Sequence, residues 1–175
     1  MSVAVEAPTI EDIRAAETRL TGLALRTPLI RLNYPDTPAN IDLKLESLQP
    51  IGVFKIRSIG NILKSMDAES LRRSLYTAST GSAGYALAWL ARRLNIPATI
   101  FMPDTAPEGK RASIKQRGAE IKILSYEDWW TVICNHGTPN QPGLFVDPVC
   151  DPVAAHKSLA RWVDSVISIG CYRCH

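Results

Sequence analysis

Several features that would assign a function at once are absent from this chain. Its longest apolar run, 85–91, is far shorter than the roughly 18 residues that a membrane-spanning helix needs. The first residues carry acidic side chains rather than a basic start followed by an apolar stretch, so no secretory signal is visible and we expect a cytoplasmic protein. The ten glycines never lie closer together than Gly81 and Gly84. That spacing excludes the G-x-G-x-x-G fingerprint of dinucleotide-binding folds and also a Walker loop.

Neither the charge nor the aromatic content indicates a nucleic-acid-binding protein. The net charge is only +3, and aromatic residues make up 7% of the chain. The densest basic pairs lie on expected helices or at their ends, without aromatic residues between them: Arg72-Arg73, Arg92-Arg93 and Lys110-Arg111. Such pairs are typical of solvated helix faces. We therefore expect neither a nucleic-acid partner nor a membrane partner.

Four cysteines are present, and two of them, Cys171 and Cys174, belong to a motif. Cys134 and Cys150 stand singly and are expected to be small, mostly buried hydrophobic residues. The segment Cys171 to His175 matches the attachment pattern of a c-type haem, but that chemistry also needs an oxidising compartment, a porphyrin pocket and a distal ligand. A zinc or redox pair is a second interpretation. We favour a tail without metal chemistry and expect no metal site.

Short helices and strands are predicted to alternate along the chain. Helical periodicity is found in 10–20, 55–66, 84–94 and 108–117, and strand-like patterns are found in 41–45, 75–78, 98–102 and 120–124. Alternation of elements this short predicts βαβ units and therefore an α/β fold with a parallel sheet. The length of 175 residues suits one domain, or one domain with part of another.

Lys55 is the most informative single residue. It lies between Phe54 and Ile56, with Val53 before them and a turn at 50–52. An apolar environment disfavours the ammonium ion, lowers the lysine pKa and leaves a neutral amine that attacks aldehydes, as a Schiff-base lysine must. The alternative is a snorkelling lysine at a helix start, with its stem on the core and its charge in water. Taken alone, Lys55 favours the second interpretation.

A second segment, Ser79-Thr80-Gly81-Ser82, changes that balance. It follows an expected strand and opens an expected helix, where free N–H groups and the helix dipole attract an anion. Hydroxyl side chains add donors, and glycine permits a close approach to the backbone. A carboxylate or a phosphate is the natural ligand. The alternative is simple N-capping of the helix by Ser79, Thr80 or Ser82.

Together these segments resemble the fold-type II pyridoxal-phosphate enzymes, and among them the threonine dehydratase and serine racemase group. Any one motif is weak, but the ordered set, from about residue 10 to about residue 153, is specific. The matching segments are Arg26 to Leu29, Leu43 to Pro50, Gly52 to Arg57, Thr77 to Gly84, Ile96 to Pro103, Pro107 to Lys110, Gly118 to Glu120, and Gly143 to Pro148 with Asp151-Pro152.

The resemblance implies a three-layer fold, with helices on both faces of a parallel sheet as in the β subunit of tryptophan synthase, here incomplete. It implies pyridoxal 5'-phosphate as the cofactor and a small amino acid as the substrate. Lys55 would be the Schiff-base lysine and would shuttle the proton at the substrate α-carbon. Phe54 would pack beside the cofactor ring, and Thr80 would supply a hydroxyl acid or base on the opposite face. The substrate carboxylate would be held by Ser79, Thr80, Gly81, Ser82 and Ala83.

Departures of three kinds accompany the resemblance. Ser82 stands where the family usually has an asparagine that bonds the cofactor's ring oxygen, so Ser82 is the expected cofactor contact with one donor in place of an amide. Val53 replaces a small hydroxyl residue, and Ser58 replaces a common glycine. Family members also continue well beyond this length, with a glycine-rich loop that binds the cofactor phosphate.

We therefore expect residues 1–154 to be the N-terminal portion of a lyase, comprising the small domain and part of the cofactor domain. Residues 155–175 are expected to be an aberrant tail. The expected activity is loss of water and ammonia from L-threonine or L-serine, giving a 2-oxo acid, impaired at this length. The alternatives are an inactive fragment or pseudoenzyme that binds a full-length relative, and a sister activity of the racemase or cysteine synthase type. A homo-oligomer is a further form of association that the resemblance leaves open.

Overall fold

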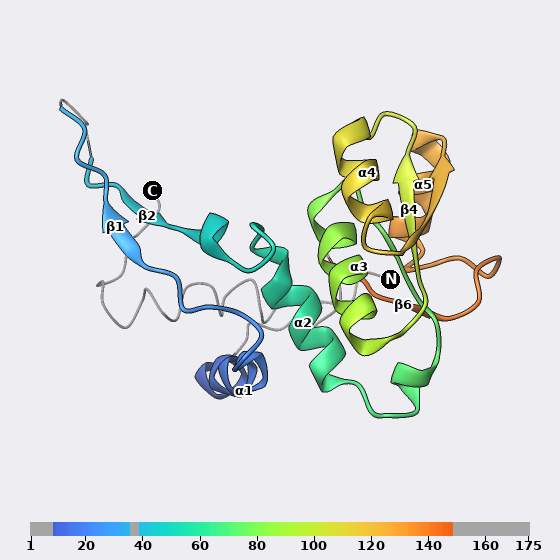
Figure 1. The fold of residues 1–175 in the computed structure, drawn as a ribbon, viewed down its shortest axis with the longest axis horizontal. Coiled ribbons are helices and arrows are strands. Elements are labelled where there is room, and N and C mark those ends of the chain that lie inside the picture. The colour runs from blue at the N-terminus through green and yellow to red at the C-terminus, as the bar shows by residue number, and fades with distance from the viewer. Residues whose placement is uncertain (1–8, 36–38, 149–175) are drawn as a thin grey trace.

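The computed structural model describes residues 9–35 and 39–148 of the chain. Helices and strands follow one another from the N-terminus, as Figure 1 shows. Their order is α1 (Ile10–Leu20), β1 (Leu29–Arg31), β2 (Asp42–Lys44), α2 (Lys55–Ser65), β3 (Leu75–Ala78), α3 (Ser82–Leu94), β4 (Ala98–Pro103), α4 (Glu108–Lys115), β5 (Glu120–Leu124), α5 (Tyr126–Cys134) and β6 (Leu144–Phe145). Short 3-10 helices at Glu46–Leu48 and Ser70–Arg72 lie between these elements.

Strands β3 to β6 form a four-stranded sheet in the order β5-β4-β3-β6. All its pairs are parallel, with Leu75 opposite Ala98 in one pair and opposite Leu144 in another. The chain adds β4 and then β5 on one side of β3, and afterwards returns to place β6 on the other side. The direction of strand addition therefore reverses between β3 and β6, which is the position where α/β sheets bind their ligands.

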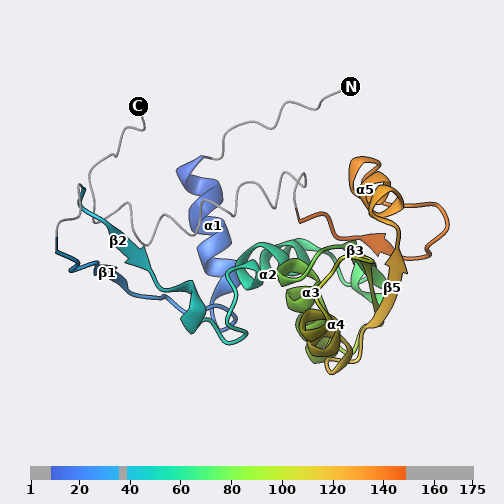
Figure 2. The same cartoon turned by 90° about the horizontal axis from the view of Figure 1, so that it is seen from above.

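Helices cover both faces of this sheet. On one face α2, α3 and α4 pack over strand residues such as Leu75, Ile100 and Met102 in the larger core. On the other face Trp129 and Val132 of α5 pack with Tyr76, Ala78 and Phe101. Neighbouring strand residues point to opposite faces, so each strand contributes to both cores. Figure 2 shows α3 and α4 on one side of the strands and α5 on the other. The predicted α/β fold with a helix-covered parallel sheet is confirmed.

The N-terminal part of the structure extends away from the sheet (Figure 1). It comprises α1, which packs on α2, and the antiparallel pair of β1 and β2, in which Ile30 lies opposite Leu43. Helix α1 begins with a capping box, because the Thr9 side chain accepts from the Asp12 N–H and the Asp12 side chain accepts from the Thr9 N–H. Helix α2 also packs against α3 and joins this part to the sheet.

A buried ion pair fixes the start of α2 to the segment after β2. Arg57 is 7% exposed and donates to both carboxylate oxygens of Glu46, at 2.9 and 3.0 Å, and to the Leu25 carbonyl at 2.7 Å. Burial alone would raise the pKa of Glu46. Hydrogen bonds from Arg57 and Thr27, with the charges of Arg57 and Lys44, outweigh burial and hold that pKa below its ordinary value.

The sequence predictions locate most of these elements. The predicted ranges of α1, β3 and β5 are confirmed to the residue, and α2 ends one residue before its predicted end. Helix α3 begins at Ser82 rather than Gly84, so the last serine of the hydroxyl-rich loop belongs to its first turn. Helix α5 was not predicted.

The prediction that Cys134 is buried is wrong: it is exposed at the end of α5, whose buried residues are Trp129 and Val132. Cys150 lies outside the described residues.

Candidate active site

The candidate site lies at the carboxyl ends of β3 and β6, where the direction of strand addition reverses. The loop 79–81 follows β3, and the segment 146–148 follows β6. Because the two strands are parallel neighbours, both segments leave the same edge of the sheet. The buried Thr77 hydroxyl donates to the Val146 carbonyl at 2.7 Å and holds the two strand ends together.

Lys55 is directed toward this edge from the first turn of α2. Its side chain is half-buried, and its Nζ donates to the Pro148 carbonyl at 3.2 Å, across 93 positions of the sequence. The same Nζ lies 5.4 Å from the centroid of the half-buried Phe54 ring. The amine is therefore neither sealed in an apolar pocket nor extended into open water. It is held where the backbone leaves β6.

The loop 79–81 presents backbone donors at the start of α3. The buried Ser79 hydroxyl accepts from the Gly81 N–H at 3.1 Å, which shapes the loop. No side chain caps α3, and its first helical hydrogen bond runs from the Tyr85 N–H to the Gly81 carbonyl. Within the part of the chain that the structure describes, the N–H groups of Ser82, Ala83 and Gly84 have no hydrogen-bond partner. Simple N-capping therefore does not account for this loop, which retains the free donors of an anion site.

The other predicted site residues lie in the same loop or beside Lys55. Thr80 is exposed, Gly81 and Ala83 are buried, and Ser82 is half-buried as the first residue of α3. Helices α2 and α3, which carry Lys55 and this loop at their starts, lie side by side in Figures 1 and 2 and share one core. The fold thus brings the predicted lysine and the predicted anion loop to one region.

Two features of the site were not predicted from sequence. One is the Pro148 carbonyl that receives the Lys55 amine, and a contact across 93 positions leaves no local signal. The other is the buried Asp147, whose carboxylate lies 2.7 Å from Nδ1 of His136. This hydrogen bond links the residue before Pro148 to the segment after α5.

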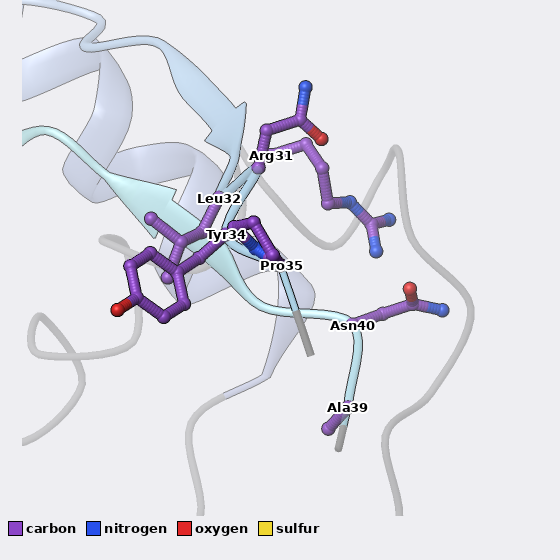
Figure 3. Close-up of a pocket in the computed structure, with 7 residues that line it drawn as sticks. Arg31, Leu32, Tyr34, Pro35, Ala39 and Asn40 are labelled. Atoms are coloured by element: carbon purple, nitrogen blue, oxygen red, sulfur yellow. The ribbon is translucent and has the colours of Figure 1, made fainter. Parts of the chain in front are cut away.

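Elsewhere the structure has few candidate sites. A hollow of about 620 Å³ lies beyond β1 and is lined by 31–35 with Ala39 and Asn40 (Figure 3). It contains none of the predicted site residues. Between residues 9 and 148, apart from 36–38, no three metal-ligating side chains gather. None of the described helices has the length and apolarity to cross a bilayer. The motif from Cys171 to His175 lies outside the described residues.

Comparison with known proteins decides the family. The model of the pyridoxal-phosphate-dependent enzymes matches residues 20–154, which include α2, the whole parallel sheet and the anion loop. The chain belongs to this family. The predicted resemblance is confirmed, and membership of this family implies pyridoxal phosphate as the cofactor.

Curated relatives of the chain include two dehydratases. The L-serine dehydratase/L-threonine deaminase of Mus musculus is 36% identical over 133 residues, which is 74% of this chain and 40% of the relative. The catabolic L-threonine dehydratase TdcB of Staphylococcus aureus (strain USA300) is 36% identical over 113 residues, 63% of this chain and 33% of its own length. The chain therefore spans well under half the length of these relatives.

Solved structures agree on the fold. Maize serine racemase matches 94% of this chain and 52% of its own with a TM-score of 0.74 at 26% identity. The serine racemase of Dictyostelium discoideum matches 93% of this chain and 54% of its own with a TM-score of 0.75, and at 21% identity this match shows the fold alone. Both matches cover about half of the solved chain.

Proposed function

We propose that the chain is the N-terminal portion of a pyridoxal-phosphate-dependent ammonia-lyase that acts on L-threonine or L-serine. One observation carries the proposal: a lysine amine and an uncapped helix N-terminus flank the same edge of the sheet, where the strand order reverses. The 36% identity with an L-serine dehydratase/L-threonine deaminase supports this choice of substrates.

The residues present fit the cofactor at its reactive end. Lys55 would be the covalent attachment point, since its amine lies at the sheet edge within reach of the segment after β6. Phe54 would contact the ring, and Ser82 would donate its hydroxyl to the ring oxygen. When bound, the cofactor supplies an electron sink that stabilises negative charge at the substrate α-carbon.

The loop at the start of α3 would hold the substrate. The partnerless N–H groups of Ser82, Ala83 and Gly84 donate to its carboxylate, and the helix dipole adds to their attraction. This anchoring fixes the α-carbon relative to the Lys55 amine, which takes and returns the proton there. The exposed Thr80 hydroxyl would serve the opposite face of the α-carbon. Loss of the β-hydroxyl as water would leave an enamine that becomes an imine, and hydrolysis of this imine by a water molecule would give the 2-oxo acid and ammonia.

Covalent trapping tests this proposal. The full chain is mixed with pyridoxal phosphate, reduced with sodium borohydride and digested, and the labelled lysine is identified by mass spectrometry. We expect the label on Lys55 and its loss in Lys55→Ala. Lys64→Ala is the matched control, because Lys64 is exposed in the last turn of the same helix. A label on another lysine, or on none at saturating cofactor, would reject the proposed mechanism.

A second candidate is a pseudoenzyme that binds a full-length relative. The observation in its favour is that the chain spans only 40% and 33% of the two dehydratases. It predicts no cofactor uptake and a stable complex when the chain is mixed with a purified full-length dehydratase. Uptake of cofactor without ammonia release from threonine or serine would instead direct the assays to racemisation and to cysteine synthesis.

A further inference from the structure

The side chain of Lys110 lies across the anion loop. A Cβ atom added to Gly81 would be 2.5 Å from Cδ of Lys110 and 3.1 Å from both Cε and Nζ. The space in which a side chain of Gly81 would lie is therefore occupied by the methylene stem of Lys110. This lysine belongs to α4, a helix that packs beside α3. The ammonium group consequently lies next to the start of α3.

This position is electrostatically unfavourable for a cation. Lys110 is in the first turn of α4 and lies beside the start of α3, so its ammonium is near the positive ends of two helix dipoles. Among residues 9–35 and 39–148, no carboxylate pairs with it and no acceptor bonds it. The free N–H groups of Ser82, Ala83 and Gly84 add to the positive potential. An anion bound at the loop would relieve all of these interactions together.

We infer that Lys110 is a further binding residue of the site and supplies the positive charge that pairs with the substrate carboxylate held at the start of α3. This inference rests on the proposed function. The N–H groups fix the direction of the carboxylate, and the ammonium, on a flexible stem, contributes charge without a fixed geometry. Since Lys110 is exposed, its attraction is screened by salt.

The competing explanation is that Lys110 only packs its methylene stem over Gly81. Lys110→Met separates the two roles, because methionine keeps an unbranched stem and lacks the charge. Lys110→Arg keeps a charge, although in a different shape. Lys115→Met is the matched control, since Lys115 is an exposed lysine in the last turn of the same helix.

The experiment is an NMR titration of the full chain, in which the amide signals of residues 82–84 are followed as L-serine is added. L-Serinamide, which lacks the carboxylate, is titrated in parallel. For the unmodified chain we expect these amides to shift with L-serine and not with L-serinamide. Lys110→Met should weaken L-serine binding about tenfold, as expected for the loss of one charge-assisted contact. Lys110→Arg should retain most of the affinity, and Lys115→Met all of it. Added salt should weaken binding in the unmodified chain more than in Lys110→Met.

The outcomes separate the two proposals. Equal affinity for L-serine in the unmodified chain and in Lys110→Met would overturn the role of Lys110 while leaving the carboxylate loop intact. Equal shifts with L-serine and L-serinamide, or no shift with either, would overturn the carboxylate loop itself and Lys110 with it. The covalent trapping of Lys55 does not depend on either result.

Discussion

Two polar regions adjoin helix α2, and their hydrogen bonding differs. Beneath its first turn, Arg57 is buried and bidentate to Glu46, whose carboxylate also accepts from Thr27 and Gln49. At the sheet edge beyond the same turn, the start of α3 has three N–H groups without a partner in the described chain, and the Lys110 ammonium beside them is likewise unpaired there. One region is saturated with internal partners, and the other is not.

The difference separates structural from functional polar groups. Buried charges cost free energy unless they are paired, so loss of either partner in the saturated region would destabilise the junction of α2 with the N-terminal part. Donors left open at a strand-order reversal do not contribute to folding and are free to bind a ligand. Lys55 and Arg57 are only two positions apart in α2, so a basic residue's role here depends on its partners rather than on its sequence neighbours.

The largest expected effect concerns the saturated region. Glu46→Gln removes the charge that compensates Arg57 and leaves a guanidinium that is 7% exposed without its counter-ion. We expect a loss of about 3–5 kcal/mol in the free energy of unfolding, as is typical when one partner of a buried pair is removed. Urea denaturation measures it. Glu17→Gln, on an exposed position of α1, is the control and should change little. A loss below about 1 kcal/mol would place the Arg57 pair among ordinary surface ion pairs.

The sequence predicted the parts of this comparison unequally. Helix α2 and strand β3 have clear periodicity or apolar runs, and they were found almost to the residue. Strand β6 has two residues, too few to show a period, and its pairing with β3 depends on segments 69 positions apart. The reversal of strand order was therefore not foreseen. Helix α5 was missed, although Ser125 caps its first turn.

The site residues were predicted by another route. Lys55 and the loop 79–83 were selected as candidates because their residue types suit an amine nucleophile and an anion site, and because they match family motifs in order. The Pro148 carbonyl and the stem of Lys110 are long-range partners with no local pattern, so only the fold reveals them. Local chemistry thus proposes the residues of the candidate site, and the tertiary structure shows what surrounds them.

A second, smaller effect is expected at the floor of the anion loop. A Cβ on Gly84 would lie 2.6 Å from Cγ2 of Ile100 and 3.4 Å from Cδ1 of Ile114, both fully buried. Gly84→Ala should therefore cost about 1–2 kcal/mol of stability by overpacking. Gly109→Ala is the control in α4, where a Cβ has open space, and it should be neutral or slightly stabilising. Thermal unfolding followed by circular dichroism compares the two. Equal thermal unfolding midpoints for the two variants would mean that the packing around Gly84 accommodates a methyl group.

Acid should weaken the saturated region in particular. The pKa of Glu46 is below its ordinary value in the folded chain, so the unfolded chain binds more protons between the two pKa values. The contribution of Glu46 is fully present above its ordinary pKa and is lost as pH falls through the lowered one. We expect the urea midpoint to fall below about pH 4.5, and to fall less in Glu46→Gln, which has no carboxyl group to protonate there. If the urea midpoints of the unmodified chain and of Glu46→Gln fell equally with falling pH, Glu46 would not be the group responsible.

The smallest expected effect has the opposite sign. Lys110 is exposed and near two helix N-termini, where a cation without a partner is unfavourable by about 0.3–1 kcal/mol. Lys110→Met keeps the stem over Gly81 and removes the charge, so it should leave stability unchanged or raise it by up to that amount, while Lys115→Met should lower it slightly because a cation at a helix C-terminus is favourable. Urea denaturation of both variants in low salt measures the difference. A marked loss in Lys110→Met would show that the lysine contributes to folding. Unchanged or higher stability, together with weaker binding of L-serine, is the result expected of a charge that is retained for a ligand.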